Sequence, residues 1–417
     1  MNTFNRLEKE VVKKELCHQC GSCVGACPVN CIEIKGFAGS PVLTGKCIDC
    51  GLCYEVCPGK GMDREKAYEH MKETSNTEFG LVKKTYLVRS KDNTVIKNAA
   101  SGGAITSILL YLLDKKVVNQ VALASMNKDK PWEPELLLAK TSEDIRRSSQ
   151  SKYTLLSMNS LLAKIKPNES YAFVGLPCHI NGIKNMDMYA PNKTKNCKLT
   201  IGIFCGANTN FGATEFLYKK MGVKKEDTAK MEYRGGKWPG GFLVTLKNGE
   251  QKFFHKFYHN VVIPPFMDNR CMLCPDFYNE FADIAVGDAW LPELIKKQDP
   301  WSLILVRTKR GLETITKAEK AGFIETKEIT MSDVMRAQKH QLKIKVQGGL
   351  SKIRFAKLFG RPTPTYDFPN IKTSLFKGLA LTVIVKKAHL FRPIFYITPI
   401  KWWGKLAEIA RKIVVGK

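Results

Sequence analysis

Residues 17–28 read CHQCGSCVGACP, and residues 47–58 read CIDCGLCYEVCP. Both stretches have the pattern Cys-x2-Cys-x2-Cys-x3-Cys-Pro, and the second begins thirty residues after the first. In this pattern the first three cysteines wrap one face of an iron–sulfur cluster, whereas the fourth, next to proline, points to the neighbouring cluster. The repeat therefore predicts two 4Fe-4S clusters within one small module.

The pattern assigns four cysteines to each predicted cluster. The first cluster takes Cys17, Cys20, Cys23 and Cys57, and the second takes Cys47, Cys50, Cys53 and Cys27. A zinc-binding repeat is the alternative, but zinc motifs pair their cysteines two and two and do not repeat this triple spacing. Cys31 has no counterpart in the second repeat, where Gly61 stands, and we assign it no role.

The composition bounds the class of protein. A chain of 417 residues with 44% hydrophobic and 25% charged residues is long enough for two or three folded domains. No run approaches the ~18 apolar residues of a membrane span, and the first residues lack the apolar core of a signal peptide. We therefore expect a cytoplasmic protein, in which fourteen cysteines indicate cluster ligation rather than disulfides.

The net charge of +27 is concentrated away from the cysteine repeat. Residues 1–60 carry seven basic and six acidic side chains, whereas residues 351–417 carry fourteen basic and two acidic ones. Such a basic end serves a nucleic acid, an anionic membrane or an acidic partner. We predict no nucleic-acid binding, because the sequence contains no recognition motif for it.

The segment 375–417 mixes lysines with aromatic residues, among them Trp402 and Trp403. Pro393 and Pro399 divide it into pieces too short to span a membrane. Lysine beside tryptophan is typical of a helix lying at a membrane surface, which would place the protein at the inner face of the membrane. Packing on the body or on a partner subunit explains the same residues, so both interpretations stay open.

From about residue 85 the pattern changes to that of an α/β body. TYLVRS predicts a strand, and NAASGGAITSILLYLLDKK predicts a loop that runs into a helix. Ser101 is the expected N-cap, and Gly102 and Gly103 would let a ligand approach the amides of the first turn. A helix start of this kind can bind phosphate, although a plain cap is the better interpretation of these three residues alone.

Two further predicted strands end close to a cysteine. YAFVGLPCHI places Cys178 after one strand, and LTIGIFCGAN places Cys205 after another. Ligands gather outside the carboxyl ends of strands in an open parallel sheet, whereas Cys197 precedes its strand and belongs to the opposite edge. Cys271 and Cys274 form a separate Cys-x-x-Cys. These four candidates suit a third cluster, and buried free thiols beside an incidental pair suit the pattern equally well.

Several stretches together resemble the beta-subunit family of coenzyme F420 hydrogenases and dehydrogenases. They are ASGGAITSILLYLL (100–113), SKY (151–153), GLPCHINGI (175–183), IGIFCG (201–206), YRGGKWPGG (233–241) and CMLCPDFYNEFADIAVGDAW (271–290). Relatives in which a two-cluster ferredoxin module precedes this body resemble residues 1–60 as well.

The resemblance implies FAD near Ser101, Gly102 and Gly103, with Lys152 in contact with it. It also implies a third 4Fe-4S cluster beside the flavin, held by Cys178, Cys205, Cys271 and Cys274. Flavin exchanges a hydride with a two-electron partner and single electrons with clusters. Coenzyme F420 is the implied substrate, although family members elsewhere use other acceptors.

Other residues near these motifs have two interpretations each. Arg234 and Lys237 either hold a flavin phosphate or an acidic deazaflavin tail, or they belong to a glycine-rich turn. Asp288 either contacts the flavin ribose or caps a turn. His179, in a stretch expected to be a loop, is either a donor to the cluster or flavin, or a solvent-facing side chain.

The predicted organisation has four parts. Residues 1–66 form a bacterial-type ferredoxin module, residues 80–165 and 166–335 form the two parts of an α/β flavin-binding body with a mixed sheet, and residues 336–417 form a basic helical tail. The predicted function is an FAD-dependent iron–sulfur oxidoreductase that exchanges electrons with ferredoxin or another redox protein and with a hydride carrier. The alternative is a non-catalytic electron-relay subunit docked through its tail to a partner enzyme or membrane.

Overall fold

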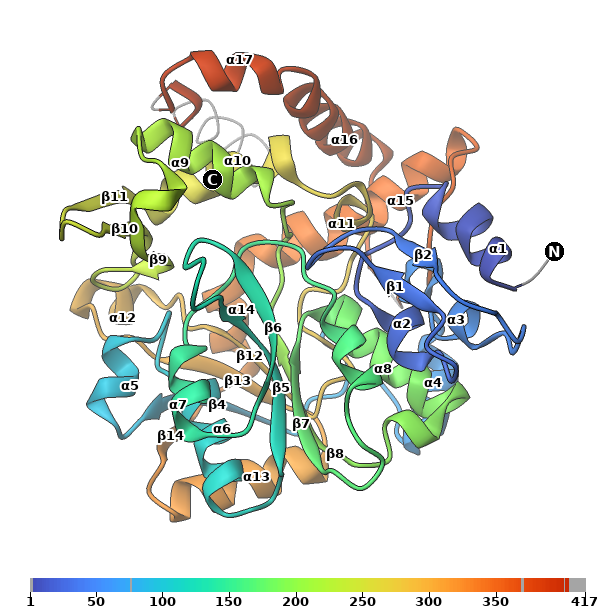
Figure 1. Ribbon diagram of the computed structural model, residues 1–417, viewed down its shortest axis with the longest axis horizontal. Helices are drawn as coiled ribbons and strands as arrows, with labels where there is room; N and C mark the ends of the chain where they lie inside the picture. The colour runs from blue at the N-terminus through green and yellow to red at the C-terminus, as the bar shows by residue number, and fades with distance from the viewer. Residues whose placement is uncertain (1–2, 76, 369–370, 401, 405–417) are drawn as a thin grey trace.

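The computed structural model describes residues 3–75, 77–368, 371–400 and 402–404. Its centre is an eight-stranded mixed sheet (Figure 1). The strands follow one another across the sheet in the order β14 (Ile324–Glu328), β4 (Lys84–Ser90), β13 (Ser302–Val306), β12 (Ile284–Asp288), β8 (Cys197–Ile203), β7 (Tyr171–Gly175), β5 (Gln120–Met126) and β6 (Pro134–Ala139).

The four middle strands β12, β8, β7 and β5 are parallel, and the flanking pairs are antiparallel. The predicted mixed sheet is thus confirmed. All five residues of β7 are buried, as expected for a parallel strand that is covered on both faces. Because the middle strands run in one direction, β7 and β8 bring their carboxyl ends to the same edge of the sheet.

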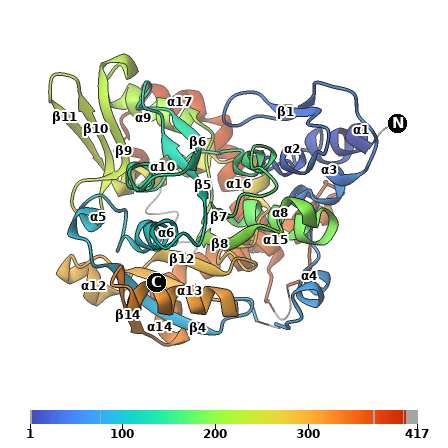
Figure 2. The same ribbon diagram turned by 60° about the horizontal axis from the view of Figure 1, so that its bottom comes forward.

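Helices cover both faces of the sheet (Figure 2). One face packs against α6 (Ala104–Asp114) and α13 (Lys309–Lys320), which share an apolar core with alternate strand residues such as Ala172 and Val174. The other face packs against α8 (Pro177–Tyr189) and α14 (Met331–Gln341). Shorter helices at the edges are α5 (Asn93–Lys97), α7 (Ser142–Arg147), η3 (Met158–Ala163), η4 (Pro191–Lys193) and α12 (Pro292–Lys297).

The N-terminal module packs on α8 and η3. Its elements are α1 (Thr3–Leu7), η1 (Glu8–Val12), α2 (Ser22–Ala26), the hairpin β1 (Ile32–Ile34) and β2 (Pro41–Leu43), α3 (Leu52–Glu55), η2 (Pro58–Lys60), β3 (Gly61–Met62) and α4 (Arg64–Met71). The approach is close, because a Cβ atom on Gly182 of α8 would lie 2.0 Å from Ser22 Oγ of α2. Small residues on both sides therefore let the module lie directly against the body.

A three-stranded antiparallel sheet stands beside the main one, at the left of Figure 1. It consists of β9 (Thr228–Gly235), β10 (Gly241–Leu246) and β11 (Gln251–His255), and it packs with α9 (Gly212–Met221) and α10 (Lys256–Phe266). The 3-10 turn η5 (Lys225–Asp227) leads into β9, and α11 (Asn269–Met272) follows α10.

The basic C-terminal region is helical, but it is not a detached tail. The π-helical turn η6 (Leu342–Gln347) and α15 (Gly348–Leu358) pack into the molecule, and β15 (Thr365–Tyr366) pairs in parallel with β3 of the N-terminal module. Helices α16 (Leu375–Leu390) and α17 (Arg392–Ile397) then form the upper edge in Figure 1. In the described part of the chain, no helix combines the length and the apolar character needed to cross a membrane.

Candidate iron–sulfur and cofactor sites

The two cysteine repeats have the same backbone conformation. Gln19 and Asp49 both adopt left-handed φ angles, 57° and 53°, and each donates its N–H to the sulfur of the cysteine two residues earlier, at 3.3 and 3.4 Å. Gly21 and Gly51 follow with φ of 83° and 82°, where a side chain would be strained. Each repeat therefore folds as a tight turn with backbone amides directed at sulfur.

The structure groups eight cysteines as the spacing predicts. Cys23 has Cys17, Cys57 and Cys20 as its strongest electrostatic neighbours after burial, and all of these raise its pKa well above the usual value. We call Cys17, Cys20, Cys23 and Cys57 the first thiol set. Their ligand roles stay a prediction, and the crossing of the fourth cysteine into the neighbouring repeat is what the pattern requires.

The second thiol set is Cys47, Cys50, Cys53 and Cys27. Burial and then Cys47, Cys50 and Cys27 raise the pKa of Cys53 to about 12. Cys31, to which we assigned no role, lies against this set: its N–H donates to Cys27 Sγ at 3.4 Å, and the two sulfurs are 3.5 Å apart. Cys31 thus donates a backbone hydrogen bond to the second set and packs its side chain against Cys27.

The two sets differ in their distance from solvent. A Cβ atom on Gly21 would lie 2.6 Å from Ser160 N of η3, whereas a Cβ on Gly51 would meet no atom of the described residues within 4 Å. Cys50 is exposed, and Cys20 is buried. The first set therefore faces the body, and the second set faces outward.

Four further cysteines line one small buried cavity at the carboxyl edge of the sheet. We call Cys178, Cys205, Cys271 and Cys274 the third thiol set. After burial, the neighbours that raise the pKa of Cys178 are Cys20 of the first set and then Cys271, Cys205 and Cys274. The structure thus brings together the four candidates and places a cysteine of the N-terminal module next to them.

Each member of the third set is held by a different element. Cys178 lies in the first turn of α8, so the expected loop at residues 177–179 is wrong, and the helix N-terminus favours a thiolate there. Cys205 follows β8, Cys271 belongs to α11, and Cys274 follows that helix. Burial raises the pKa of Cys205 to about 11 and that of Cys271 to about 12, and coordination to a metal deprotonates such thiols.

The donor set of the cavity suits a cluster. Among the residues that the structure describes, no group of three or more His, Cys, Asp or Glu side chains is spaced for a single metal ion. In a 4Fe-4S cluster each thiolate binds a different iron, so the ligands stand farther apart than around one ion. Four thiols on one cavity, all from the protein, complete the ligand requirement of such a cluster.

Four polar side chains that the sequence did not single out also line this cavity: His18, Asn208, Asp276 and Lys345. His18 is 4% exposed, and no described residue forms a hydrogen bond with either of its ring nitrogens. Lys345 of η6, 5% exposed, donates to the carbonyl of Cys271 at 3.3 Å. Burial lowers the pKa of Lys345, but Cys274, Cys205 and Cys271 reverse this effect, so that its pKa lies above the usual value.

Neither interpretation of His179 is right. This side chain is buried, Nδ1 accepts the N–H of Leu176 at 3.0 Å, and Nε2 lies 3.0 Å from the carbonyl of Leu156. The ring is therefore neutral with its proton on Nε2, and burial lowers its pKa to about 4. His179 fixes the start of α8 and with it the position of Cys178.

Arg270 ties the third set to the N-terminal module. It is fully buried beside Cys271, and its guanidinium donates to the carbonyls of Gly59 and Pro58 at 3.2 and 3.3 Å, directly after Cys57. It also donates to Tyr366 Oη of β15 at 3.0 Å. One side chain thus links the loop of the Cys-x-x-Cys, the first thiol set and the C-terminal region.

The Ser101-Gly102-Gly103 turn differs from the expectation. Gly103 is the N-cap of α6 with φ of 75°, whereas Ser101 donates its hydroxyl to the carbonyl of Trp301 at 2.7 Å. A Cβ atom on Gly102 would lie 2.6 Å from the carbonyl of Val88 and 2.7 Å from the amide of Ser302. Gly102 is therefore required for packing against β4 and β13, and protein atoms fill the space where its side chain would lie.

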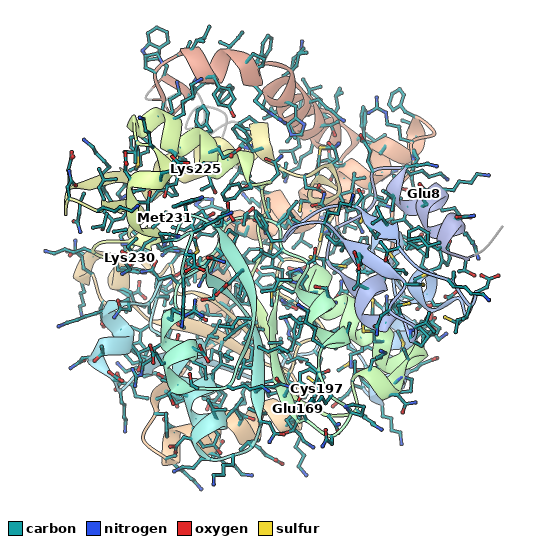
Figure 3. The ribbon with its side chains drawn as sticks, in the orientation of Figure 1. Glu8, Glu169, Cys197, Lys225, Lys230 and Met231 are labelled. Carbon is teal, nitrogen blue, oxygen red and sulfur yellow. The ribbon has the colours of Figure 1, made fainter. Side chains whose placement is uncertain are left out.

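Lys152 lies at a second cavity, of about 310 Å³, between α7 and β9. Its ammonium donates to the carbonyls of Ser148, Ser149 and Gln150 at 2.5, 2.8 and 3.1 Å, so it fixes the loop that lines the cavity. Burial and then Arg147 lower its pKa to about 7. Arg146, Arg147 and Lys230 also line this cavity and carry positive charge. Two of its lining residues on β9, Lys230 and Met231, can be located in Figure 3.

Arg234 is buried, and protein groups already accept from its guanidinium on every side. Nε donates to the carbonyl of Pro239, Nη1 to Tyr153 Oη and Asp288 Oδ2, and Nη2 to the carbonyl of Ala100. Asp288 is thus its ion-pair partner at 3.1 Å, and neither interpretation given for Asp288 describes this contact. Arg234 joins β9, the end of β12 and the turn before α6.

Cys197 lies where its position before the strand predicts. It is the first residue of β8, and Figure 3 shows it at the lower end of the sheet. Burial raises its pKa to about 12, and its nearest charged neighbours are Arg310 and Asp283. It therefore takes no part in the third thiol set.

The fold and the cysteine sets define the protein as an iron–sulfur protein. Residues 16–62 match the family model described as 4Fe-4S dicluster domain. Residues 85–163 match the model for the N-terminal part of the coenzyme F420 hydrogenase/dehydrogenase beta subunit, and residues 168–332 match the model for its C-terminal part. The chain belongs to this beta-subunit family.

Curated relatives are similar over most of the chain. A coenzyme F420-dependent sulfite reductase of Methanocaldococcus jannaschii is 27% identical to this chain. The match covers 77% of this chain but only 48% of the length of that reductase. The beta subunit of a coenzyme F420 hydrogenase of Methanothermobacter thermautotrophicus is 29% identical over 60% of this chain and 86% of the relative.

A solved structure has the same fold. It is a chain of the F420-reducing NiFe hydrogenase complex from Methanosarcina barkeri, with a TM-score of 0.57 and 24% identity. The match covers 70% of this chain and 98% of that one. At this identity the likeness shows the fold alone.

Proposed function

We propose that the protein is an FAD-dependent iron–sulfur oxidoreductase that transfers electrons between its clusters and coenzyme F420 or a similar hydride carrier. The observation that carries the proposal is the third thiol set, four cysteines on one buried cavity with Cys20 of the first set as a neighbour. The names of the sulfite reductase and hydrogenase relatives support coenzyme F420 as the carrier.

When bound, clusters carry single electrons and flavin exchanges a hydride, so together they couple one-electron to two-electron chemistry. The chain's own residues set the order of the sites. Cys53 of the outward second set is a neighbour of Cys23, and Cys20 is a neighbour of Cys178. The three thiol sets thus follow one another in the order second, first, third from the surface of the module to the edge of the sheet, which suits ferredoxin or another redox protein as the external partner.

The second cavity is the proposed site of the flavin or of an acidic carrier. Four basic side chains line it, of which Arg146, Arg147 and Lys230 pair with Asp92, Glu135 and Glu232. Basic groups outnumber the one carboxylate on the cavity wall, Glu232, which favours an anionic ligand. Two buried polar atoms on it, Gln150 Oε1 and Arg147 Nε, have no hydrogen-bond partner among the described residues. This cavity lies near the third thiol set, because Lys152 lines this cavity and Leu155 lines the cavity of the third set. Three residues of chain span at most ~11 Å, so the Cα atoms of these two residues are no farther apart than that.

The alternative, an electron-relay subunit without its own catalysis, rests on the relatives that are named as subunits. In that case the clusters are present and the partner enzyme carries the flavin. Flavin content therefore separates the two functions.

Lys152→Met should weaken FAD retention while iron content stays unchanged. The ammonium holds the carbonyls of residues 148–150, and the isosteric methionine cannot donate to them. Since burial lowers the pKa of Lys152 to about 7, the wild type should also release FAD more readily as the pH rises through that value, where the amine loses its third proton. Released flavin per chain measures both effects.

Lys140→Met, at an exposed lysine near α7, is the matched control and should retain FAD. Full FAD retention in Lys152→Met at every pH would remove this cavity as the flavin site. A wild-type chain that holds all its iron but never binds FAD would support the relay subunit instead.

A further inference from the structure

Lys345 is a buried cation that lacks a carboxylate partner. Among the described residues, no Asp or Glu oxygen comes within the 4.0 Å of an ion pair with its Nζ, and the one hydrogen bond is to the carbonyl of Cys271. A buried charge is strongly unfavourable unless an opposite charge lies close to it. After burial, the groups with the largest electrostatic effect on Lys345 are the thiol groups of Cys274, Cys205 and Cys271, ahead of Asp276.

His18 lacks a partner in the same cavity. Within the part of the chain that the structure describes, both ring nitrogens are buried without a hydrogen bond, although a neutral imidazole always has one N–H to donate. Its place in the chain is informative, because it directly follows Cys17 of the first set and lines the cavity of the third set. A donor without an acceptor at this point indicates that the cavity's occupant accepts hydrogen bonds.

We propose that Lys345 is the counter-charge of the cluster held by the third thiol set and that His18 donates a hydrogen bond to the same cluster. The proposal rests on the third cluster of the proposed function. Four thiolates give a 4Fe-4S cluster a net negative charge, which the ammonium of the buried Lys345 offsets.

The expected consequence is a raised reduction potential. A cation and an N–H donor beside a cluster stabilise its reduced, more negative state, so they make it easier to reduce. Lys345 belongs to η6, a segment distant in sequence from both the N-terminal module and the Cys-x-x-Cys. A π-helical turn of this kind often marks a functional position in a helix.

The test is a redox titration of the full chain, reconstituted anaerobically and followed by electron paramagnetic resonance. Lys345→Met keeps the volume of the side chain and removes its charge, and Lys345→Arg keeps the charge. We expect Lys345→Met to shift one cluster of three to lower potential or to lose its four or so irons, and Lys345→Arg to stay near wild type. His18→Leu should shift the same cluster in the same direction.

Lys184→Met is the control, because Lys184 lies on α8 with Cys178 but pairs with Asp187 at 3.1 Å. Equal potentials in wild type and Lys345→Met at full iron content would overturn the proposal, as would equal losses in Lys345→Met and Lys345→Arg. A wild-type chain with only ~8 irons would instead remove the third cluster of the proposed function itself.

A different observation concerns the outer face of α16 and α17, at the upper edge of Figure 1. Large apolar side chains are exposed along it, and Phe376 and Ile397 are 80% and 82% exposed. We call this surface the outer tail face, and its other exposed apolar members are Leu375, Leu379, Val383, Leu390, Phe391 and Ile394. Between Asp367 and Glu408 the sequence has no acidic residue, and residues 371–404 carry six basic ones.

From this face we infer a second property, peripheral binding to anionic lipid. Apolar side chains at the surface of a helix enter the interfacial region of a bilayer, and lysines beside them attract anionic headgroups. Lys386 and Lys387 are exposed between the apolar members, as such a contact requires. The absence of carboxylates in this stretch of sequence removes the main source of repulsion.

Sedimentation of the full chain with vesicles tests this inference. Phosphatidylglycerol vesicles should bind the protein in low salt, phosphatidylcholine vesicles should bind it less, and the triple variant Phe376→Ser, Leu379→Ser, Ile397→Ser should bind at least about tenfold more weakly. Phe253→Ser, at an exposed phenylalanine on β11, is the control. If the wild-type protein does not bind phosphatidylglycerol vesicles, the inference of lipid binding is wrong, and a partner subunit is the remaining occupant of the outer tail face.

Discussion

Replacing Cys271 and Cys274 together by alanine should remove about four of the ~12 irons expected per chain and disconnect the flavin from viologen. Both thiols line the cavity that also holds Cys178 and Cys205, and a 4Fe-4S cluster does not persist on two ligands. The first and second thiol sets lie outside this cavity, so about eight irons should remain. Iron analysis and the rate of viologen-driven flavin reduction measure the two effects.

Cys197→Ala is the matched control, because Cys197 is also buried but lies at the start of β8. It should change neither the iron content nor the rate. Equal iron in the double variant and the wild type would contradict the third cluster, and loss of all iron would show that the three thiol sets do not assemble independently.

Glu280→Gln should lower the free energy of unfolding by about 3–5 kcal/mol, because it leaves Arg64 as an uncompensated buried charge. The two side chains are each 4% exposed, and three hydrogen bonds of 2.6 to 3.0 Å join them. Tyr68 Oη adds a fourth bond to Glu280 at 2.6 Å. Arg64 and Tyr68 belong to α4 and Glu280 to the loop before β12, so this ion pair holds the N-terminal region against the body.

Urea denaturation of the anaerobic protein measures this loss. Glu293→Gln is the control, since Glu293 pairs with Arg336 at the surface and such exposed pairs contribute under about 1 kcal/mol. A loss in Glu280→Gln no larger than in the control would mean that the buried pair does not stabilise the contact between module and body.

The sequence predicts the parts of this structure that depend on local spacing. The two cysteine repeats determine their own turns, since the left-handed positions at Gln19, Gly21, Asp49 and Gly51 lie within each motif. The order of strand and cysteine likewise places Cys178 and Cys205 at one edge of the sheet and Cys197 at the other, because parallel strands share a direction.

Contacts between distant segments are not predictable in this way. Lys345 reaches the third thiol set from η6, and nothing in the local sequence of that turn distinguishes it from other lysines of a basic region. Ser101 and Gly102 look like a ligand-binding cap, but β4 and the turn before β13 occupy the space beside them. From the sequence Arg234 resembles a phosphate ligand, but in the folded chain its guanidinium donates to Asp288 and Tyr153.

The most direct test of the central claim is the bleaching of coenzyme F420 by the anaerobically purified chain with reduced viologen as the only electron donor. The account predicts bleaching that depends on bound FAD and is lost in the variant without Cys271 and Cys274. A chain that carries FAD and ~12 irons but leaves coenzyme F420 unreduced would contradict it.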